Sequence, residues 1–198
     1  MSVLISGGAD GADSLFEKYA KLNKHTTVIH KPDTIPENLK ETYDQLITFI
    51  NSTFLNREYP TKKERINDMI RRDIMIGLES EIMYAVAALN DQNIIVGGTA
   101  WACYTFVNKC IGCLAWTPSS PSAPLQAALN LFPDGFIPLY LFDQQKNCWF
   151  QAQVQLIYNR ISYVRINQPK LSGNYYGGIG LRDLNENGKR AIKLLYES

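Results

Sequence analysis

Residues 6–20 read SGGADGADSLFEKYA, a glycine-rich turn between a short apolar run and a helical pattern. The run SVLIS at 2–6 is rich in β-forming residues, which predicts a strand. After the turn, apolar residues recur at helical spacing up to about residue 23. TTVIH at 26–30 predicts a second strand, stopped by Pro32. The chain therefore begins with a predicted β-α-β unit whose strands are parallel.

The rest of the chain continues the alternation of strands and helices. Two helical patterns fill 36–78, with a break near the proline of NREYPT at 56–61. A helix is predicted through AWACYTFVNK, and the chain ends on a strand, a glycine turn and an amphipathic helix. Further strands are predicted at 81–86, 94–96, 137–143, 148–158 and 161–166. The pattern predicts one α/β domain over 1–198, Rossmann-like, with a mostly parallel sheet and helices on both faces.

Composition and charge exclude several classes of protein. Twenty basic and nineteen acidic side chains leave a formal charge of +1, so no global field attracts nucleic acid or an anionic membrane. No apolar run approaches the ~18 residues that span a bilayer, and the first residues lack the features of a signal peptide. We expect a cytoplasmic protein with neither a membrane nor a nucleic acid as partner.

The cysteines fit that compartment as reduced, buried or half-buried thiols. Cys110 and Cys113 form a C-x-x-C motif, but Cys103 and Cys148 do not supply the second pair of a zinc site. We therefore expect no metal and no cofactor, with metal or redox use of the CIGC pair as the alternative.

Three glycine turns carry the functional prediction: SGGADGAD at 6–13, VGGTAW at 96–101 and YGGIGLRD at 176–183. Each is predicted to follow a strand, and ligands of open parallel sheets bind beyond the carboxyl ends of the strands. Glycine lets the backbone approach a phosphate, and a helix N-terminus presents free N–H groups. We expect the three turns to converge on one crevice; the alternative is that they only close tight connections. None matches a Walker or dinucleotide motif.

The segments SGGADGADSLFEKYA, GGTAWA and GGIGLRDLNENGKRAI resemble motifs of the SLOG superfamily, which includes LOG phosphoribohydrolases, the DNA-uptake protein DprA and YpsA-like proteins. The resemblance covers most of the chain with gaps. In YpsA-like proteins the G-I-G-x-R segment comes first, whereas here it comes last. The chain therefore resembles the circularly permuted YpsA-like branch, and the strand at 2–5 is expected to complete the unit formed by the terminal strand and helix.

The resemblance implies the residues of a nucleotide site: backbone donors for phosphate, arginines for bidentate contacts and carboxylates for ribose hydroxyls. By resemblance they are Gly7, Gly8, Gly11, Asp13, Glu17, Arg72, Gly97, Gly98, Thr99, Gly178, Gly180 and Arg182. Ser6, Asp10 and Trp101, which lie in the same segments, complete the expected ligand-binding residues.

Several of these side chains have a structural alternative. Asp10 and Asp13 are equally suited to capping the first helix, and Glu17 to a solvated surface. Arg72 is of the kind that commonly forms a surface ion pair. Trp101 is suited to stacking on a base but more typical of a core. Trp149 is expected to close over the same mouth or to pack against the last strands.

Two functions remain open. The first is a binding protein that captures a nucleotide-derived small molecule, of ADP-ribose type or a cyclic nucleotide signal, as a sensor or a sequestering protein in antiviral signalling. The second is an N-glycoside hydrolase that uses Glu17, Asp13 and Arg72. LOG enzymes carry a glutamate after their P-G-G-x-G-T turn, and the stretch VGGTAWACYTF lacks one, which favours the binding protein.

Three further expectations complete the interpretation. DNA handling as in DprA is disfavoured, because the charge is neutral and no basic run is interleaved with aromatic residues. Relatives of this class commonly form dimers, so we expect a homodimer or higher homo-oligomer. Within residues 104–136, the Pro/Ser stretch TPSSPSAP is the best candidate for a mobile loop over the site, and a lid over the whole range is left open.

Overall fold

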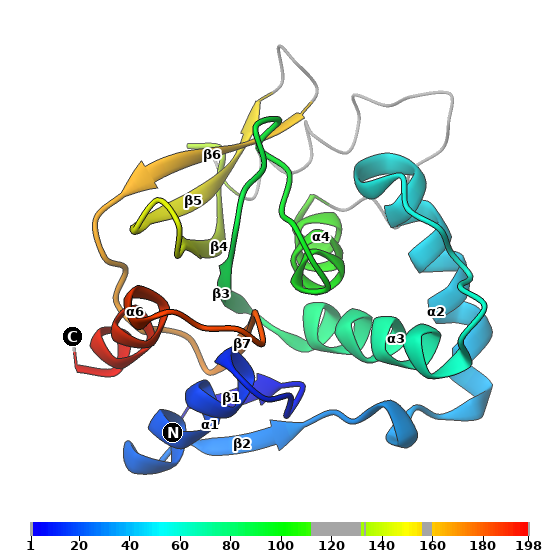
Figure 1. Cartoon of the computed structure of the whole chain (residues 1–198), viewed down its shortest axis with the longest axis horizontal. Helices are drawn as coiled ribbons and strands as arrows, with labels where there is room; N and C mark the ends of the chain where they lie inside the picture. The colour runs from blue at the N-terminus through cyan, green and yellow to red at the C-terminus, as the bar shows by residue number, and fades with distance from the viewer. Residues whose placement is uncertain (1, 112–131, 133, 156–159, 198) are drawn as a thin grey trace.

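A computed structural model describes residues 2–111, 132, 134–155 and 160–197, and its seven strands form one sheet in the order β2-β1-β7-β3-β4-β5-β6 (Figure 1). The strands are β1 (Val3–Ser6), β2 (Thr26–Ile29), β3 (Ile82–Ala87), β4 (Phe136–Asp143), β5 (Cys148–Gln155), β6 (Arg160–Ile166) and β7 (Tyr175–Gly180). Neighbours from β2 to β4 are parallel, and β5 is antiparallel to both β4 and β6. The predicted α/β class and mostly parallel sheet are therefore confirmed.

Helices cover both faces of the sheet, as the alternating pattern predicted. They are α1 (Ala12–Leu22), α2 (Glu37–Ile50), α3 (Glu64–Glu79), α4 (Thr99–Cys110) and α6 (Glu186–Glu197). On one face α1 and α6 bury Phe16 and Leu195, and on the other α3 and α4 bury Ile74 and Phe106. Helix α2 packs outside α3 and α4 (Figure 1). None of the helices in the described part of the chain is long and apolar enough to cross a membrane.

The first strand of the chain lies beside the last one. β1 pairs in parallel with β7, with Leu4 opposite Tyr176, and β7 also pairs in parallel with β3. This confirms that the first strand completes the unit made by β7 and α6. As a result, the loop after β1 and the loop after β7 leave the same edge of the sheet side by side.

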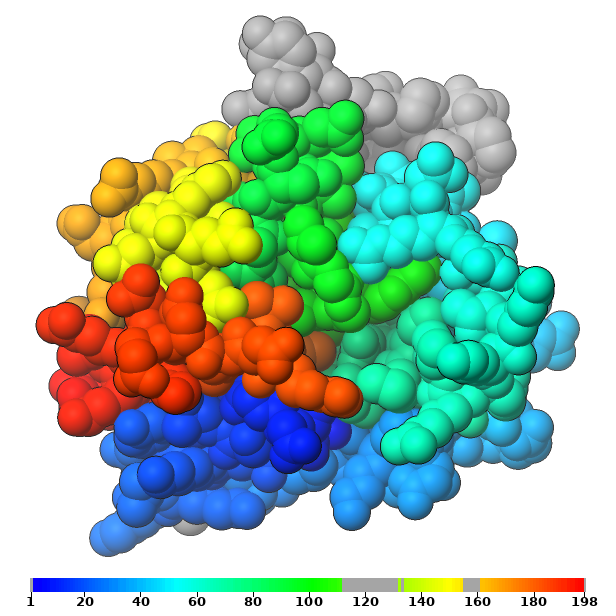
Figure 2. Space-filling model, viewed as in Figure 1, coloured from blue at the N-terminus to red at the C-terminus, as the bar shows by residue number. Residues whose placement is uncertain are grey.

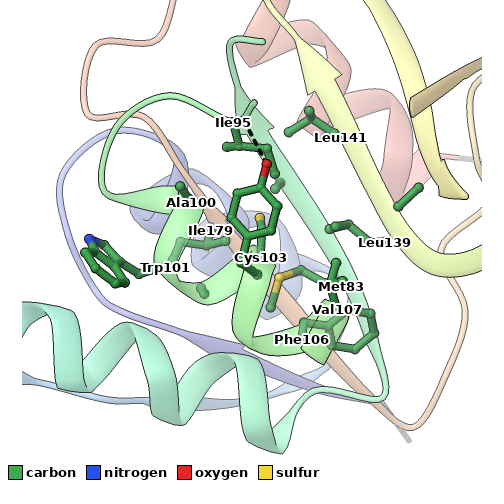
Figure 3. Packing of buried hydrophobic residues seen from close by; sticks show 14 of the residues in the cluster. Met83, Ile95, Ala100, Trp101, Cys103, Phe106, Val107, Leu139, Leu141 and Ile179 are labelled. Atoms are coloured by element: carbon green, nitrogen blue, oxygen red, sulfur yellow. Dashed lines mark hydrogen bonds between the residues drawn. The ribbon is translucent and has the colours of Figure 1, made fainter. Parts of the chain in front are cut away.

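The predicted strand at 94–96 is wrong, because these residues form no strand of the sheet. Ile95 makes only an isolated bridge to Leu89. The Asn90 side chain accepts the N–H of Ile94, and the Tyr104 hydroxyl accepts the N–H of Ile95, the dashed line in Figure 3. Fully buried Ile95 thus anchors a loop that runs from β3 to α4.

The predicted glycine turn of the YGGIGLRD segment is also wrong, because Gly178 and Gly180 lie within β7. A Cβ at Gly178 would lie 2.7 Å from a ring carbon of Phe16, and one at Gly180 would lie 2.6 Å from the Cβ of Ala12. These glycines therefore let α1 pack close to the strand, and the turn begins only at Leu181.

Candidate functional site

Four segments enclose a cavity of about 170 Å³ at the carboxyl edge of the sheet. They are the 9–13 loop after β1, the side of α3 that carries Arg72 and Asp73, Gly98 and Thr99 at the start of α4, and residues 179–182. We call this cavity the glycine crevice. In Figure 2 the orange segment that follows β7 lies directly above the dark blue loop after β1. Parts of all three predicted glycine segments thus meet at one place.

Gly11 brings the first loop against the end of β7. It precedes α1 with φ 94° and ψ −124°, a conformation for which only glycine is suited. A Cβ there would lie 2.2 Å from the carbonyl oxygen of Arg182. The next N–H, of Ala12, donates to the carbonyl of Leu181 at 3.0 Å. Gly11 therefore shapes the wall of the crevice through backbone contact.

Asp13 is one of the two buried carboxylates that line the glycine crevice, the other being Asp73, and it does not cap α1. Its Oδ1 accepts the N–H of Gly180 at 3.0 Å and its Oδ2 accepts the N–H of Ala9 at 3.4 Å. The side chain is almost fully buried, and this burial raises its pKa to about 7, although Arg72 opposes the shift. A carboxyl group that titrates near neutral pH is suited to donating or accepting a proton.

Arg72 forms a buried ion pair, where a surface ion pair was the expected alternative. Its Nε and Nη2 donate to one carboxylate oxygen of Asp73 at 3.0 and 2.6 Å, and its Nη1 donates to the carbonyl of Gly7 at 3.3 Å. A Cβ at Gly7 would lie 2.7 Å from the guanidinium carbon. Gly7 therefore leaves room for the guanidinium beneath the first loop. Burial raises the pKa of Asp73, which Arg72 partly opposes.

The start of α4 is held in place by Arg57, which the sequence did not single out. Its guanidinium donates to the carbonyls of Gly97 at 2.7 Å and Ile95 at 3.2 Å. In a trans peptide the C=O and N–H point in opposite directions, so the N–H of Gly98 is directed away from Arg57. Gly98 and Thr99 line the glycine crevice at the start of this helix, where the N–H groups of Ala100 and Trp101 already donate to the carbonyls of Gly97 and Gly98. The N–H groups of Gly98 and Thr99 are therefore the ones that a ligand can use.

The rim of the glycine crevice carries one exposed cation and one exposed anion. Arg182 and Asp10 both line the cavity and both are solvent-exposed. Asp10 does not cap α1, because the N-cap position is Gly11 and no side chain bonds there. Arg182 is thus the cation at the rim, whereas the inner guanidinium of Arg72 is occupied by Asp73.

Glu17, Ser6 and Gly8 lie near the first loop, but they are not among the described residues that line the glycine crevice. A Cβ at Gly8 would come within 2.6 Å of Ile29, and its φ of 64° also favours glycine. One Glu17 carboxylate oxygen and the Ser6 hydroxyl are buried without a hydrogen-bond partner among the described residues. Burial raises the pKa of Glu17 despite Lys21 and Lys31.

Trp101 belongs to the core, which was its alternative role. Its ring is 4% exposed and lies 6.1 Å from the ring of Tyr59. Figure 3 shows the indole on the side of α4 away from Met83 and Leu139. Trp149 packs against the ring of Phe142 near the last strands and does not reach the mouth of the glycine crevice.

The remaining expectations fall partly outside the described residues. Cys103 is buried and Cys110 is half-buried, and burial raises the pKa of the Cys110 thiol to about 12. Cys113 and the TPSSPSAP stretch, the candidate for a mobile loop, lie outside the described residues, whereas residues 104–110 belong to α4. The described residues contain no group of His, Cys, Asp or Glu suited to holding a metal ion.

Asp73 is the residue of the glycine crevice that the sequence interpretation missed. It ends the charged run Arg71-Arg72-Asp73, just before the apolar residues IMI at 74–76, and this position was the only signal for it. Comparison with known proteins returned no matching family model, no matching curated protein and no matching solved structure.

Proposed function

We propose that the protein binds a nucleotide-derived small molecule in the glycine crevice, of ADP-ribose type or a cyclic nucleotide signal, as a sensor or a sequestering protein. The observation that carries this proposal is the meeting of the first loop, the start of α4 and the end of β7 around Arg72 and Arg182. The resemblance to circularly permuted YpsA-like members of the SLOG superfamily supports the same class of ligand.

The chemistry of the walls divides the ligand into two parts. The N–H groups of Gly98 and Thr99 and the guanidinium of Arg182 suit phosphate oxygens. Asp13 suits a ribose hydroxyl, because its carboxyl group can donate a hydrogen bond when protonated and accept one when ionised. The crevice of about 170 Å³ is smaller than the ~300 Å³ at which typical small-molecule pockets begin. It therefore holds the ribose phosphate part, and the remainder extends outward past Asp10 and Arg182.

Asp13 supports a second candidate, an N-glycoside hydrolase. Burial raises its pKa to about 7, so that near neutral pH it protonates a departing base or activates the water that attacks the sugar. Arg72 supplies positive charge beside it. Glu17 does not line the glycine crevice, so the acid–base role falls to Asp13 alone. With no carboxylate after Thr99 in the first turn of α4, we place binding ahead of hydrolysis.

The test uses protein purified from cells, measured intact by native mass spectrometry and then denatured by heat to release its ligand for chromatography. Gly98→Asp is the blocking variant, because it adds a carboxylate beside Asp73 where phosphate would bind. Gly98→Ala is its matched control, since the backbone at Gly98 is helical and the nearest atom to a new Cβ lies 3.9 Å away. We expect an intact nucleotide derivative from the wild type and from Gly98→Ala, and none from Gly98→Asp.

Release of a free base, or turnover of an added nucleoside monophosphate that Asp13→Asn abolishes, would instead establish the hydrolase. Equal retention of the ligand by Gly98→Asp and Gly98→Ala would overturn the assignment of the site to the glycine crevice.

A further inference from the structure

A second, larger cavity of about 320 Å³ lies between α6, the start of β5 and the end of β6. From α6 it receives Asn187, Arg190, Ala191 and Leu194, whose spacing places them on one face of the helix. The opposite wall comes from residues 147–149 and 165–168, which antiparallel pairing of Trp149 with Ile166 holds side by side. In Figure 2 the red surface of α6 lies directly below the yellow turn that precedes β5. We call this the arginine cavity.

The charges of the arginine cavity are all of one sign. Arg165 and Arg190 line it, and no Asp or Glu is among the described residues that do. Within the described part of the chain, neither guanidinium forms an ion pair or a side-chain hydrogen bond. Lys189, by contrast, is paired with Glu186, so the acidic residue nearest on α6 is already engaged. Two unpaired guanidiniums at one cavity favour an oxyanion such as a phosphate.

The remaining walls favour a ligand that has more than an anionic group. Phe142, Trp149 and Leu194 form an apolar floor. Around it stand four carboxamides, of Asn147, Asn167, Gln168 and Asn187, whose side chains make no hydrogen bond within the described residues. A carboxamide offers both a donor and an acceptor, the combination that matches the edge of a nucleobase.

We propose that the arginine cavity binds a mononucleotide-sized organic phosphate, its phosphate held by Arg165 and Arg190 and its ring on the apolar floor among the carboxamides. The volume of about 320 Å³ lies within the range of small-molecule pockets, ~300 to 1,000 Å³. This site is separate from the glycine crevice, since no residue lines both. The proposal for the arginine cavity does not depend on the function proposed for the glycine crevice.

The experiment titrates adenosine 5′-monophosphate into the purified chain by calorimetry and follows the indole N–H signal of Trp149 by NMR, assigned with Trp149→Phe. Arg165→Gln and Arg190→Gln remove one charge each, and both side chains are exposed, so the variants are expected to fold. Arg65→Gln is the matched control, an exposed arginine that lines neither cavity. We expect each cavity variant to weaken binding about tenfold, equal to about 1.4 kcal/mol, and the control to leave it unchanged.

Three results would overturn the proposal. The first is a titration in which about 1 mM nucleotide does not saturate the wild type. The dissociation constant would then be weaker than about 1 mM, too weak for specific recognition. The second is inorganic phosphate binding as tightly as the nucleotide, which would show that the floor and carboxamides contribute nothing. The third is loss of binding in Gly98→Asp with full binding in Arg165→Gln and Arg190→Gln, which would place the nucleotide in the glycine crevice alone.

Discussion

The inner arginine of the glycine crevice is in the opposite state from the two arginines of the arginine cavity. In the glycine crevice, Arg72 is buried and its guanidinium is bonded to Asp73 and to the carbonyl of Gly7. In the arginine cavity, Arg165 and Arg190 are exposed and have no carboxylate partner among the described residues. A buried ion pair is costly to break, whereas an exposed unpaired cation contributes little to stability. Arg72 in the glycine crevice therefore contributes to the stability of the fold, whereas Arg165 and Arg190 in the arginine cavity contribute little to it.

The largest effect should come from breaking the buried pair. We expect Arg72→Met to lower the free energy of unfolding by about 3 to 5 kcal/mol, because Asp73 stays buried without its partner. Urea unfolding measures this loss. Arg190→Met should stay within about 0.5 kcal/mol of the wild type. Adding Asp73→Asn to Arg72→Met should recover part of the loss, and a double variant weaker than the single one would contradict the pairing.

The next effect concerns the backbone contact that shapes the glycine crevice. Gly11→Ala places a Cβ 2.2 Å from the carbonyl oxygen of Arg182 at a φ of 94°. We expect a loss of about 2 to 4 kcal/mol in the free energy of unfolding. Gly98→Ala, with open space and a helical backbone, should cost less than about 1 kcal/mol by the same measurement. Equal losses of unfolding free energy in the two variants would contradict this prediction. They would show that the first loop can move away from β7 with no loss of stability.

The parts of the fold and of the glycine crevice that could be predicted are those that local patterns in the sequence determine. The strands, the helices and the pairing of β1 with β7 follow from hydrophobic periodicity and from the unfinished unit at the end of the chain. The convergence of glycine segments follows from the rule that ligands bind beyond the carboxyl ends of parallel strands. Gly7, Gly11 and Gly98 were accordingly placed at the site.

What the sequence did not reveal depends on contacts between distant segments. Gly178 looks the same in a turn as in a strand, and only the packing of Phe16 against it shows why it is glycine. Arg57 acts on a loop forty residues away, at Gly97. Arg165 and Arg190 are separated in the sequence by β7, and they line one cavity only because the fold places α6 near the end of β6.

The pH dependence of stability sharpens the comparison further, because Asp13 belongs only to the glycine crevice. Burial raises the pKa of this carboxyl group to about 7 in the folded protein, from an ordinary value of 3.8. Between these values the folded state holds a proton that the unfolded chain has released. The free energy of unfolding should therefore fall as the pH rises from about 4 to about 7, by at most about 1.4 kcal/mol per pH unit for this group.

Asp13→Asn tests this dependence, since the amide does not titrate. Urea unfolding at about pH 5 and about pH 7 should show a smaller fall in stability for the variant than for the wild type. The difference between the two proteins isolates Asp13 from Asp73, whose pKa burial also raises. Parallel profiles would mean that Asp13 stays ionised in the folded protein and is no candidate for acid–base chemistry.

The smallest effect on stability, and the most selective one on binding, should come from the exposed arginines. Arg182→Gln removes the rim cation of the glycine crevice, and Arg190→Gln removes one from the arginine cavity. Both should leave the free energy of unfolding within about 0.5 kcal/mol of the wild type, because neither side chain has an ion-pair partner among the described residues. Each should weaken only the ligand of its own cavity, about tenfold, in calorimetric titrations of the two variants side by side. If Arg182→Gln also weakened adenosine 5′-monophosphate binding at the arginine cavity, the two sites would be coupled, and the separation drawn between them on their linings would be wrong.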